Sequence, residues 1–196
     1  MISAIIFDCF GVLTTDAWLP FKVKYFSTNP AQFDRASELN QQSDAGLISY
    51  EMFLDEVGKM AGMSGNAVQQ AISDNVPNEE LFDYVRELKQ AYKIGLLSNA
   101  SGDWLSDLFT KEQLGLFDAT ALSYDTRQTK PQLEAYETIA ERLGEAVDSC
   151  VFIDDQERFV TGAREAGMKG VWYKDLPQLK SELAVLLTST SADTKD

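Results

Sequence analysis

The chain contains no histidine among its 196 residues. Histidine is the usual general base near neutral pH and a common zinc ligand, so Ser-His-Asp catalysis, Cys-His catalysis and histidine-ligated zinc are excluded. The two cysteines, Cys9 and Cys150, are too few for a disulfide framework or a closed thiolate zinc site. Each adjoins a predicted buried strand, and we interpret both as buried, inert thiols. Any catalysis must therefore use carboxylates, lysine, hydroxyl groups or a hard cation.

Long hydrophobic runs and basic residues are also scarce. No apolar run approaches the roughly 18 residues of a membrane span, and the first residues lack the basic start and cleavage site of a signal peptide. Only 17 basic residues accompany 31 acidic ones, which gives a net charge of −14. This balance disfavours nucleic acid and anionic membranes as partners. We therefore expect a cytoplasmic protein, and no motif indicates its oligomeric state.

Short apolar runs alternate along most of the chain with amphipathic helical patterns, which include a helix predicted to open at Lys130-Pro131 and another predicted at 160–166. The first run, residues 3–7, ends at Asp8 and is followed at once by a glycine-containing turn. Similar runs occupy residues 92–97, 119–123, 150–153 and 170–173. Strands that alternate with helices predict βαβ crossovers, and hence an α/β fold with a Rossmann-like, doubly wound parallel sheet. Neither standard glycine-rich nucleotide-binding motif is present.

The strand pattern is interrupted between residues 16 and 79. Aromatic and apolar residues recur there at helical spacing, with breaks at Asn29-Pro30 and within residues 60–65. Ser49 is a candidate N-cap for the helix that starts near Tyr50. We predict an insertion of three or four helices. The predicted division of the chain is an α/β core at 1–15 and 80–188, a helical insertion at 16–79, and a polar, disordered tail at 189–196.

Polar side chains gather where the predicted strands end. Asp8 follows the first strand and Ser98 the second, Lys130 lies just after the third, and Asp154 and Asp155 end the fourth. The carboxyl ends of parallel strands share one edge of the sheet, where ligands bind. Clustered carboxylates repel one another unless a cation neutralises them, and an all-oxygen donor set suits Mg²⁺. Beside a lysine and a hydroxyl, such an ion favours a phosphoryl group, whose phosphorus a carboxylate can attack.

Four short motifs follow one another along the chain at plausible spacing. They are residues 7–14 (FDCFGVLT), 96–99 (LLSN), 130–131 (KP) and 151–155 (VFIDD), the last followed by 162–168 (GAREAGM). With them the chain resembles the haloacid dehalogenase-like (HAD) hydrolase superfamily over nearly its whole length. The resemblance implies that the helical insertion is the family's α-helical cap.

The resemblance also implies a role for each matched position. Asp8 would be the nucleophile that forms an aspartyl-phosphate, and the backbone carbonyl of Phe10 would bind Mg²⁺. Asp155 would contact the metal directly, with Asp154 beside it as a ligand or orienting group.

The remaining matched residues would bind the phosphoryl group. Ser98 and Asn99 would hold its oxygens, and Lys130 would bridge Asp8 and the phosphate. The resemblance therefore implies a Mg²⁺-dependent phosphatase that acts on a small phosphorylated metabolite.

One position departs from the pattern of most HAD phosphatases. They carry a second aspartate two residues after the nucleophile, which protonates the leaving group and then activates water; here that position is Phe10. Such acid–base help is worth about 10²–10⁴-fold in rate. Another carboxylate, Asp16 or Asp125, could replace it. Alternatively, the substrate has a leaving group that needs little protonation, such as an acyl, anomeric or aryl phosphate, or the protein is not a phosphatase.

Two further alternatives stay open. The haloacid dehalogenases of this superfamily resemble the chain at Phe10 and Ser98-Asn99, and their aspartate attacks carbon without a metal. They lack an acidic pair like Asp154-Asp155, which weighs against this alternative. A third alternative is a catalytically weak or non-catalytic HAD-fold protein that serves in binding or regulation.

Overall fold

A computed structural model describes residues 1–188; the tail predicted at 189–196 lies outside the described residues. Within this part of the chain, five parallel strands form one sheet in the order β3-β2-β1-β4-β5. The strands are β1 (Ala4–Phe7), β2 (Lys93–Ser98), β3 (Ala119–Leu122), β4 (Cys150–Asp154) and β5 (Lys169–Trp172). The predicted doubly wound α/β sheet is therefore confirmed, with its strands close to their predicted ranges.

The central strand β1 determines where the polar strand ends meet. All residues of β1 and β4 are buried, as expected for parallel strands covered on both faces. Phe7 pairs with Leu96 of β2 on one side and with Ile153 of β4 on the other. Asp8, the next residue, therefore lies between the carboxyl ends of β2 and β4.

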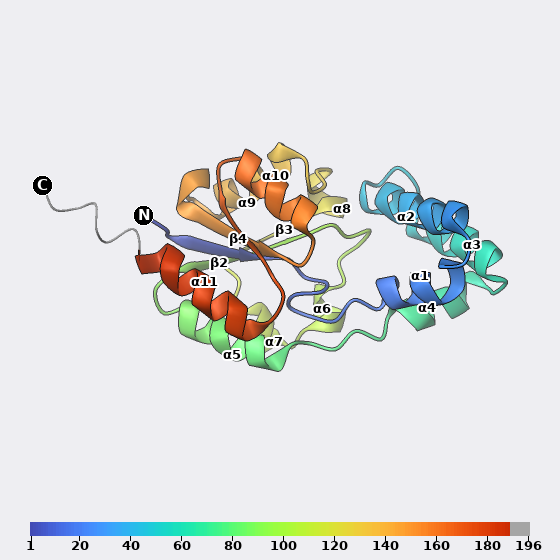
Figure 1. The fold of residues 1–196 in the computed structure, drawn as a ribbon, viewed down its shortest axis with the longest axis horizontal. Helices are drawn as coiled ribbons and strands as arrows, with labels where there is room; N and C mark the ends of the chain where they lie inside the picture. Colours follow the sequence, from blue (N-terminus) through green and yellow to red (C-terminus); the bar gives the residue numbers. More distant parts are fainter. Residues whose placement is uncertain (189–196) are drawn as a thin grey trace, which may run out of the picture.

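Helices cover both faces of the sheet (Figure 1). On one face, α5 (Glu79–Leu88) and α11 (Leu176–Thr188) pack their apolar residues against β1, β2 and β4. On the other face, α9 (Leu133–Leu143) and α10 (Glu157–Glu165) do the same. The shorter helices are α6 (Leu105–Leu108), α7 (Lys111–Leu114), α8 (Ser123–Thr126) and the 3-10 helix η1 (Val147–Ser149). Among the described residues, no helix has the length and apolar character needed to cross a bilayer.

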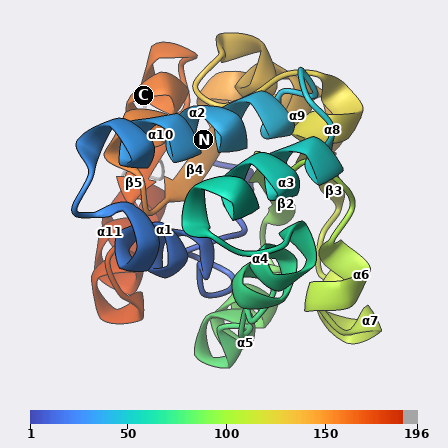
Figure 2. The same ribbon diagram turned by 90° about the vertical axis from the view of Figure 1, so that its right-hand side faces the viewer.

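The segment between β1 and α5 is helical, as its periodicity predicts. It contains α1 (Trp18–Phe26), α2 (Pro30–Asp44), α3 (Tyr50–Ala61) and α4 (Gly65–Ile72), so the predicted breaks fall between helices. The Ser49 hydroxyl accepts a hydrogen bond from the Met52 amide at 3.1 Å, which confirms the predicted N-cap. These helices share a hydrophobic cluster that includes Phe26, Phe53 and Val57. They lie beyond one end of the sheet (Figures 1 and 2).

Two linker segments connect the sheet to these helices, and the linkers are hydrogen-bonded to each other. The Thr15 amide donates to the Val76 carbonyl at 3.0 Å, and the Asn78 amide donates to the Leu13 carbonyl at 2.9 Å. The Val76 amide donates in turn to the Thr15 hydroxyl at 2.8 Å. Helices α1–α4 are therefore connected to the sheet through a pair of linkers that run side by side.

Candidate active site

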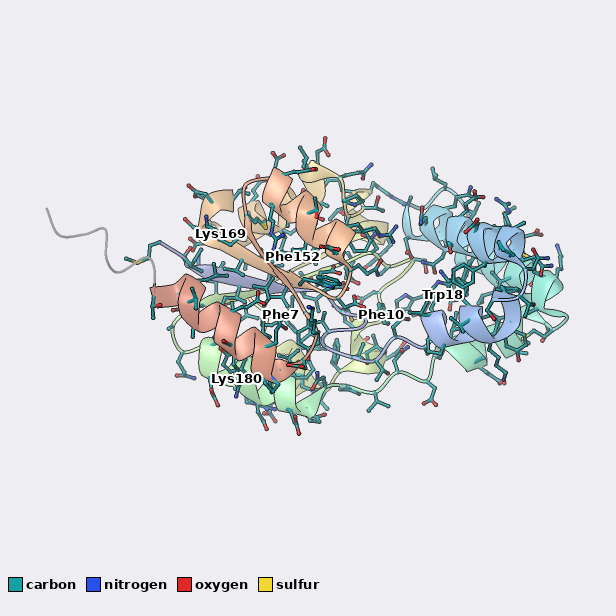
Figure 3. All side chains as sticks on the ribbon, in the orientation of Figure 1. Phe7, Phe10, Trp18, Phe152, Lys169 and Lys180 are labelled. Atoms are coloured by element: carbon teal, nitrogen blue, oxygen red, sulfur yellow. The ribbon has the colours of Figure 1, made fainter. Side chains whose placement is uncertain are left out.

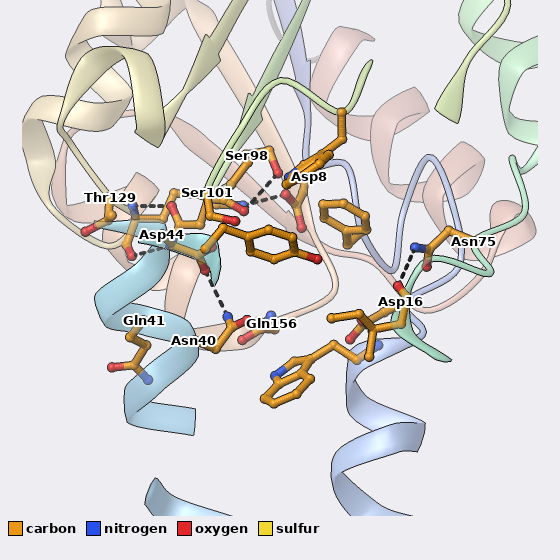
Figure 4. Close-up of a pocket in the computed structure, with 18 of the residues that line it drawn as sticks. Asp8, Asp16, Asn40, Gln41, Asp44, Asn75, Ser98, Ser101, Thr129 and Gln156 are labelled. Carbon is orange, nitrogen blue, oxygen red and sulfur yellow. Dashed lines mark hydrogen bonds and ion pairs between the residues drawn. The ribbon is translucent and has the colours of Figure 1, made fainter. Parts of the chain in front are cut away.

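A cavity of about 480 Å³ lies between the carboxyl edge of the sheet and helices α1–α4. Asp8, Ser98 and Lys130 line it from the sheet side, and Trp18 and Asp44 line it from the helices. Figure 3 shows Phe10 between the sheet and the helix that carries Trp18, and Figure 4 shows the cavity itself. The structure therefore brings the predicted strand-end residues together and covers them with the helical insertion.

Lys130 joins two of the carboxylates. Its Nζ lies 2.7 Å from Asp8 Oδ1 and 2.7 Å from Asp154 Oδ2, and all three side chains are buried. Burial alone would lower the pKa of Lys130, but the charges of Asp154 and Asp8 raise it above its ordinary value. The lysine is therefore a fixed cation that holds Asp8 in place.

Asp8 is held in an environment that resists its ionisation. Burial, reinforced by the nearby Asp154 carboxylate, raises the pKa of Asp8 to about 8, although Lys130 opposes the shift. Additional positive charge is needed to keep Asp8 fully ionised near neutral pH. The site therefore fits a bound cation on electrostatic grounds.

The carboxylates also supply a suitable donor set. Oxygens of Asp8, Asp154 and Asp155 lie within 4.8 Å of one another. Asp154 is already engaged, because Oδ1 accepts from the Gln156 amide at 2.8 Å and Oδ2 accepts from Lys130. Asp155 Oδ1 is buried and has no hydrogen-bond partner among the described residues. A buried, unpartnered carboxylate oxygen beside two further carboxylates fits a hard cation such as Mg²⁺.

The turn after Asp8 allows Asp155 to approach the backbone closely. Gly11 has a φ of +85°, and a Cβ added there would lie 2.5 Å from Asp155 Oδ2. Only glycine satisfies both the positive φ and the close contact. Burial, followed by repulsion from Asp154, raises the pKa of Asp155 to about 6.

Ser98 and Asn99 occupy different positions in the site. Ser98 is buried at the end of β2, and within residues 1–188 its hydroxyl makes only a long hydrogen bond of 3.4 Å to the Asn99 carbonyl. The Asn99 side chain accepts from the Lys130 amide at 2.8 Å and donates to the Lys130 carbonyl at 3.0 Å. Ser98 is thus free to bind a ligand, whereas the Asn99 side chain positions Lys130.

The same hydrogen bonds correct one expectation about the chain. The sequence predicts a helix that opens at Lys130-Pro131, but α9 begins at Leu133. The peptide bond between Lys130 and Pro131 is cis, and both backbone polar groups of Lys130 bond to Asn99 outside the helix. Lys130 therefore belongs to a loop that is tied to the end of β2.

The proposed substitutes for the missing second acid differ in position. Phe10 is half-buried, lines the cavity and packs against the core, so it supplies no acid. Asp16 lines the cavity, and its carboxylate accepts from the Trp18 amide at 2.9 Å. Asp125 instead pairs with Arg142 at 2.9 Å on the surface and does not line the cavity. The structure therefore removes Asp125 as a candidate.

Asp44 is a cavity residue that sequence reasoning missed. It is the last residue of α2, and its carboxyl oxygen accepts from Asn40 Nδ2 at 2.9 Å. Burial raises its pKa to about 7, while Lys130 and the Asn40 hydrogen bond oppose the shift. The spacing of Asn40 and Asp44 is visible in the sequence, but nothing in that pattern places the pair over the sheet edge.

Solved structures with a similar fold include a magnesium-bound HAD family enzyme and a dehalogenase. A HAD family enzyme from Bacteroides thetaiotaomicron, solved in complex with magnesium and inorganic phosphate, has a TM-score of 0.71 and 25% identity, with coverage of 91% of this chain and 99% of that one. The L-2-haloacid dehalogenase from Xanthobacter autotrophicus has a TM-score of 0.65 and 20% identity, with coverage of 94% and 83%. The second likeness is one of fold alone.

Sequence comparisons agree with the structural ones. Phosphatase MT3486 from Mycobacterium tuberculosis (strain CDC 1551 / Oshkosh) is 37% identical over 83 residues, a match that spans 41% of this chain and 38% of that protein. A family model of the haloacid dehalogenase-like hydrolases matches residues 2–167. The resemblance carried by the four motifs is thereby confirmed: the chain belongs to the haloacid dehalogenase-like hydrolase family.

Proposed function

We propose that the protein is a Mg²⁺-dependent phosphatase of small phosphorylated metabolites that works through an aspartyl-phosphate on Asp8. The observation that carries this proposal is Lys130, buried between Asp8 and Asp154 at 2.7 Å from each, next to the unpartnered oxygen of Asp155. A nucleophilic carboxylate, a fixed cation and an unpartnered carboxylate oxygen that can bind a metal fit phosphoryl transfer from an ester.

The proposed metal ligands are Asp8, Asp155 and the backbone carbonyl of Phe10, with Asp154 as a further ligand or an orienting group. When bound, Mg²⁺ neutralises charge on the carboxylates and on the phosphoryl oxygens. The magnesium and phosphate in the B. thetaiotaomicron enzyme, and the name of the M. tuberculosis relative, support this assignment.

The chain's own residues then have distinct tasks. Lys130 keeps Asp8 oriented toward the cavity and attracts the phosphoryl oxygens. The Ser98 hydroxyl donates a hydrogen bond to one of these oxygens, and Asn99 contributes by positioning Lys130. Asp8 attacks the phosphorus, the bond to the leaving oxygen breaks, and water later releases phosphate from Asp8.

We also propose that residues 16–79 form a cap over an α/β core made of 1–15 and 80–188. The hydrophobic cluster shared by helices α1–α4 supports this division, because it lets the insertion keep its own packing. A cap excludes water from the cavity and selects the substrate by its lining.

A second candidate function is hydrolytic dehalogenation, in which Asp8 attacks carbon and expels halide. The aromatic Phe10 at the cavity favours it. The carboxylates of Asp154 and Asp155 oppose it, because they would repel an anionic haloacid unless a cation neutralised them. A binding or regulatory role without turnover is the remaining alternative.

The decisive experiment measures phosphate release from a panel of aryl, acyl, anomeric and alkyl phosphates, with Mg²⁺ and with chelator. We expect release that chelator stops and that Asp8→Asn abolishes, because the amide cannot act as the nucleophile. Release of halide from 2-haloacids without metal would instead indicate the dehalogenase. Binding of phosphate without turnover of any compound would indicate the non-catalytic role.

A further inference from the structure

Phe10 leaves the proposed phosphatase without a group at the usual position to protonate the leaving oxygen. An alkoxide leaves slowly unless it is protonated as the bond to phosphorus breaks. A replacement acid must line the same cavity as Asp8, hold a proton near neutral pH, and be fixed in position.

Asp44 lines the cavity together with Asp8 and Lys130. In Figure 4, Asp44 and Asn40 lie on one side of the pocket, whereas Asp16 and Asn75 lie on the other. The Lys130 charge acts on the Asp44 carboxyl group, so the two side chains are within electrostatic range. Asp44 therefore shares with Asp8 the influence of the same buried ammonium group.

The end of α2 is fixed to the sheet side of the cavity. The Ser123 hydroxyl donates to the Asp44 carbonyl at 2.6 Å and accepts from the Ala100 amide at 2.9 Å. Ser123 is buried, and Ala100 closely follows Ser98 at the end of β2. The backbone of Asp44 is thus bonded to the loop that carries the proposed phosphate ligands, and Asn40 orients its carboxyl group at 2.9 Å.

Its surroundings allow Asp44 both to hold and to release a proton. Burial raises the pKa of Asp44 to about 7. Three charged or titratable groups lie around it. Lys130 opposes the rise in the pKa of Asp44, and Tyr50 has its own pKa raised by burial and by Asp44. The guanidinium group of Arg127 lies against Gly46, two residues after Asp44. A pKa near the working pH is the optimum for general acid–base catalysis.

We propose that Asp44 is the general acid and base of this hydrolase, in the role that Phe10 cannot fill; this inference rests on the proposed phosphatase function. As Asp8 attacks phosphorus, the bond from phosphorus to the leaving oxygen breaks and the Asp44 proton moves to that oxygen. The Asp44 carboxylate then takes a proton from a water molecule as the water oxygen attacks phosphorus. The bond between phosphorus and Asp8 breaks, phosphate leaves, and Asp44 is protonated again.

Asp16, another half-buried acid that lines the cavity, is less suitable. Its carboxylate accepts from the Trp18 amide at 2.9 Å at the start of α1. Burial raises the pKa of Asp16, but the backbone amides of Trp18 and Leu19 oppose the shift by stabilising the ionised form. The Asp16 carboxylate therefore serves the local backbone structure at the start of α1, whereas the Asp44 carboxyl group accepts its hydrogen bond from the Asn40 side chain.

The test compares wild type, Asp44→Asn and Asp125→Asn on 4-nitrophenyl phosphate and on simple alkyl phosphates, with Mg²⁺. We expect Asp44→Asn to lower kcat/KM for alkyl phosphates by about 10²–10⁴-fold. With 4-nitrophenyl phosphate, whose leaving group needs no proton, its first turnover should stay fast and later turnovers should slow, which gives a burst of nitrophenolate. Asp125→Asn removes one surface charge outside the cavity and should match wild type.

The possible outcomes separate this inference from the function on which it rests. The role of Asp44 would be overturned if Asp44→Asn lost kcat/KM equally on both substrate classes without a burst. It would also be overturned if the variant lost no activity on either class. In both cases, phosphate release by wild type that depends on Asp8 would leave the phosphatase proposal standing. If wild type released no phosphate, or Asp8→Asn released as much, the phosphatase proposal would fail and this inference with it.

Discussion

The ammonium group of Lys130 lies between two buried carboxylates, Asp8 and Asp154, at 2.7 Å from each. Burying an ion pair costs solvation free energy that the mutual attraction only partly offsets, so such a group is weak evidence for stability. Removing one partner is different, because it leaves charge in the interior without compensation. The lysine is therefore required by the carboxylates around it as well as by the proposed reaction.

At this scale we predict that Lys130→Met abolishes phosphate release and lowers the free energy of unfolding by about 3–5 kcal/mol, because Asp8 and Asp154 then repel each other in a buried site. Urea unfolding measures the change. The matched control is Lys59→Met, which breaks an exposed ion pair with Glu56. An equal loss of stability in both variants would contradict our account of Lys130.

The strand-end residues could be predicted from the sequence, and Asp44 could not. Asp8, Ser98 and Asp155 directly follow or adjoin short apolar runs, and the geometry of parallel sheets sends the ends of such runs to one edge. Asp44 ends a polar helix, and it reaches the cavity only because Ser123 holds α2 against the sheet. Asp125, which lies in α8, pairs instead with Arg142 on the surface, and the sequence pattern does not reveal this contact.

At the scale of elements, the turn that follows β1 combines an unusual backbone conformation with a close contact. Gly11 has a φ of +85°, and a Cβ added to Gly11 would lie 2.5 Å from Asp155 Oδ2. Gly62, at the end of α3, has a φ of +72°, and a Cβ there would meet nothing within 4 Å. Comparing the two positions therefore separates the effect of backbone strain, which both share, from the effect of contact with Asp155, which only Gly11 makes.

We predict that Gly11→Ala and Gly62→Ala each lower the free energy of unfolding by roughly 1–2 kcal/mol, because both force alanine to a positive φ. Only Gly11→Ala should also weaken Mg²⁺ binding, by about 10–100-fold, since its Cβ displaces the Asp155 carboxylate. Calorimetric titration with Mg²⁺ and urea unfolding measure the two effects. Unchanged Mg²⁺ affinity in Gly11→Ala would remove Asp155 from the proposed ligands.

Helix starts were harder to predict than strands. Strands β1 and β4 are buried on both faces, so their apolar runs mark them directly. The sequence places a helix at 160–166, but α10 begins at Glu157, because its first turn carries charged residues that the apolar pattern omits. The start of α9 depends on the bonds between Lys130 and Asn99, which join distant parts of the chain.

For the whole molecule, the acidic groups of the cavity make stability depend on pH. Burial raises the pKa of Asp8 to about 8 and that of Asp44 to about 7, from an ordinary value of 3.8. Between the ordinary pKa of 3.8 and these raised values, the two carboxyl groups keep their protons in the folded protein but lose them in the unfolded chain. The free energy of unfolding must therefore fall as the pH rises through this range.

We predict that urea unfolding of the metal-free protein gives a lower midpoint at about pH 8 than at about pH 5, because of these raised pKa values. Asp44→Asn should show a smaller difference between the two pH values than wild type, since one of the titrating groups is gone. Added Mg²⁺ should restore stability at the higher pH by neutralising the carboxylates. A midpoint that does not change with pH in the chelated wild type would contradict this prediction.

The paired linkers between the sheet and helices α1–α4 have a mechanical consequence. Thr15 and Val76 bond the two linkers to each other, so any rotation of helices α1–α4 relative to the sheet would turn about this junction. Displacement grows with distance from an axis. A rotation that hardly moves Trp18, which follows the first linker directly, would carry the end of α2 away from Ser123. The carboxyl group of Asp44 would move with it, and opening the cavity to exchange substrate and product would also withdraw the proposed proton donor from Asp8.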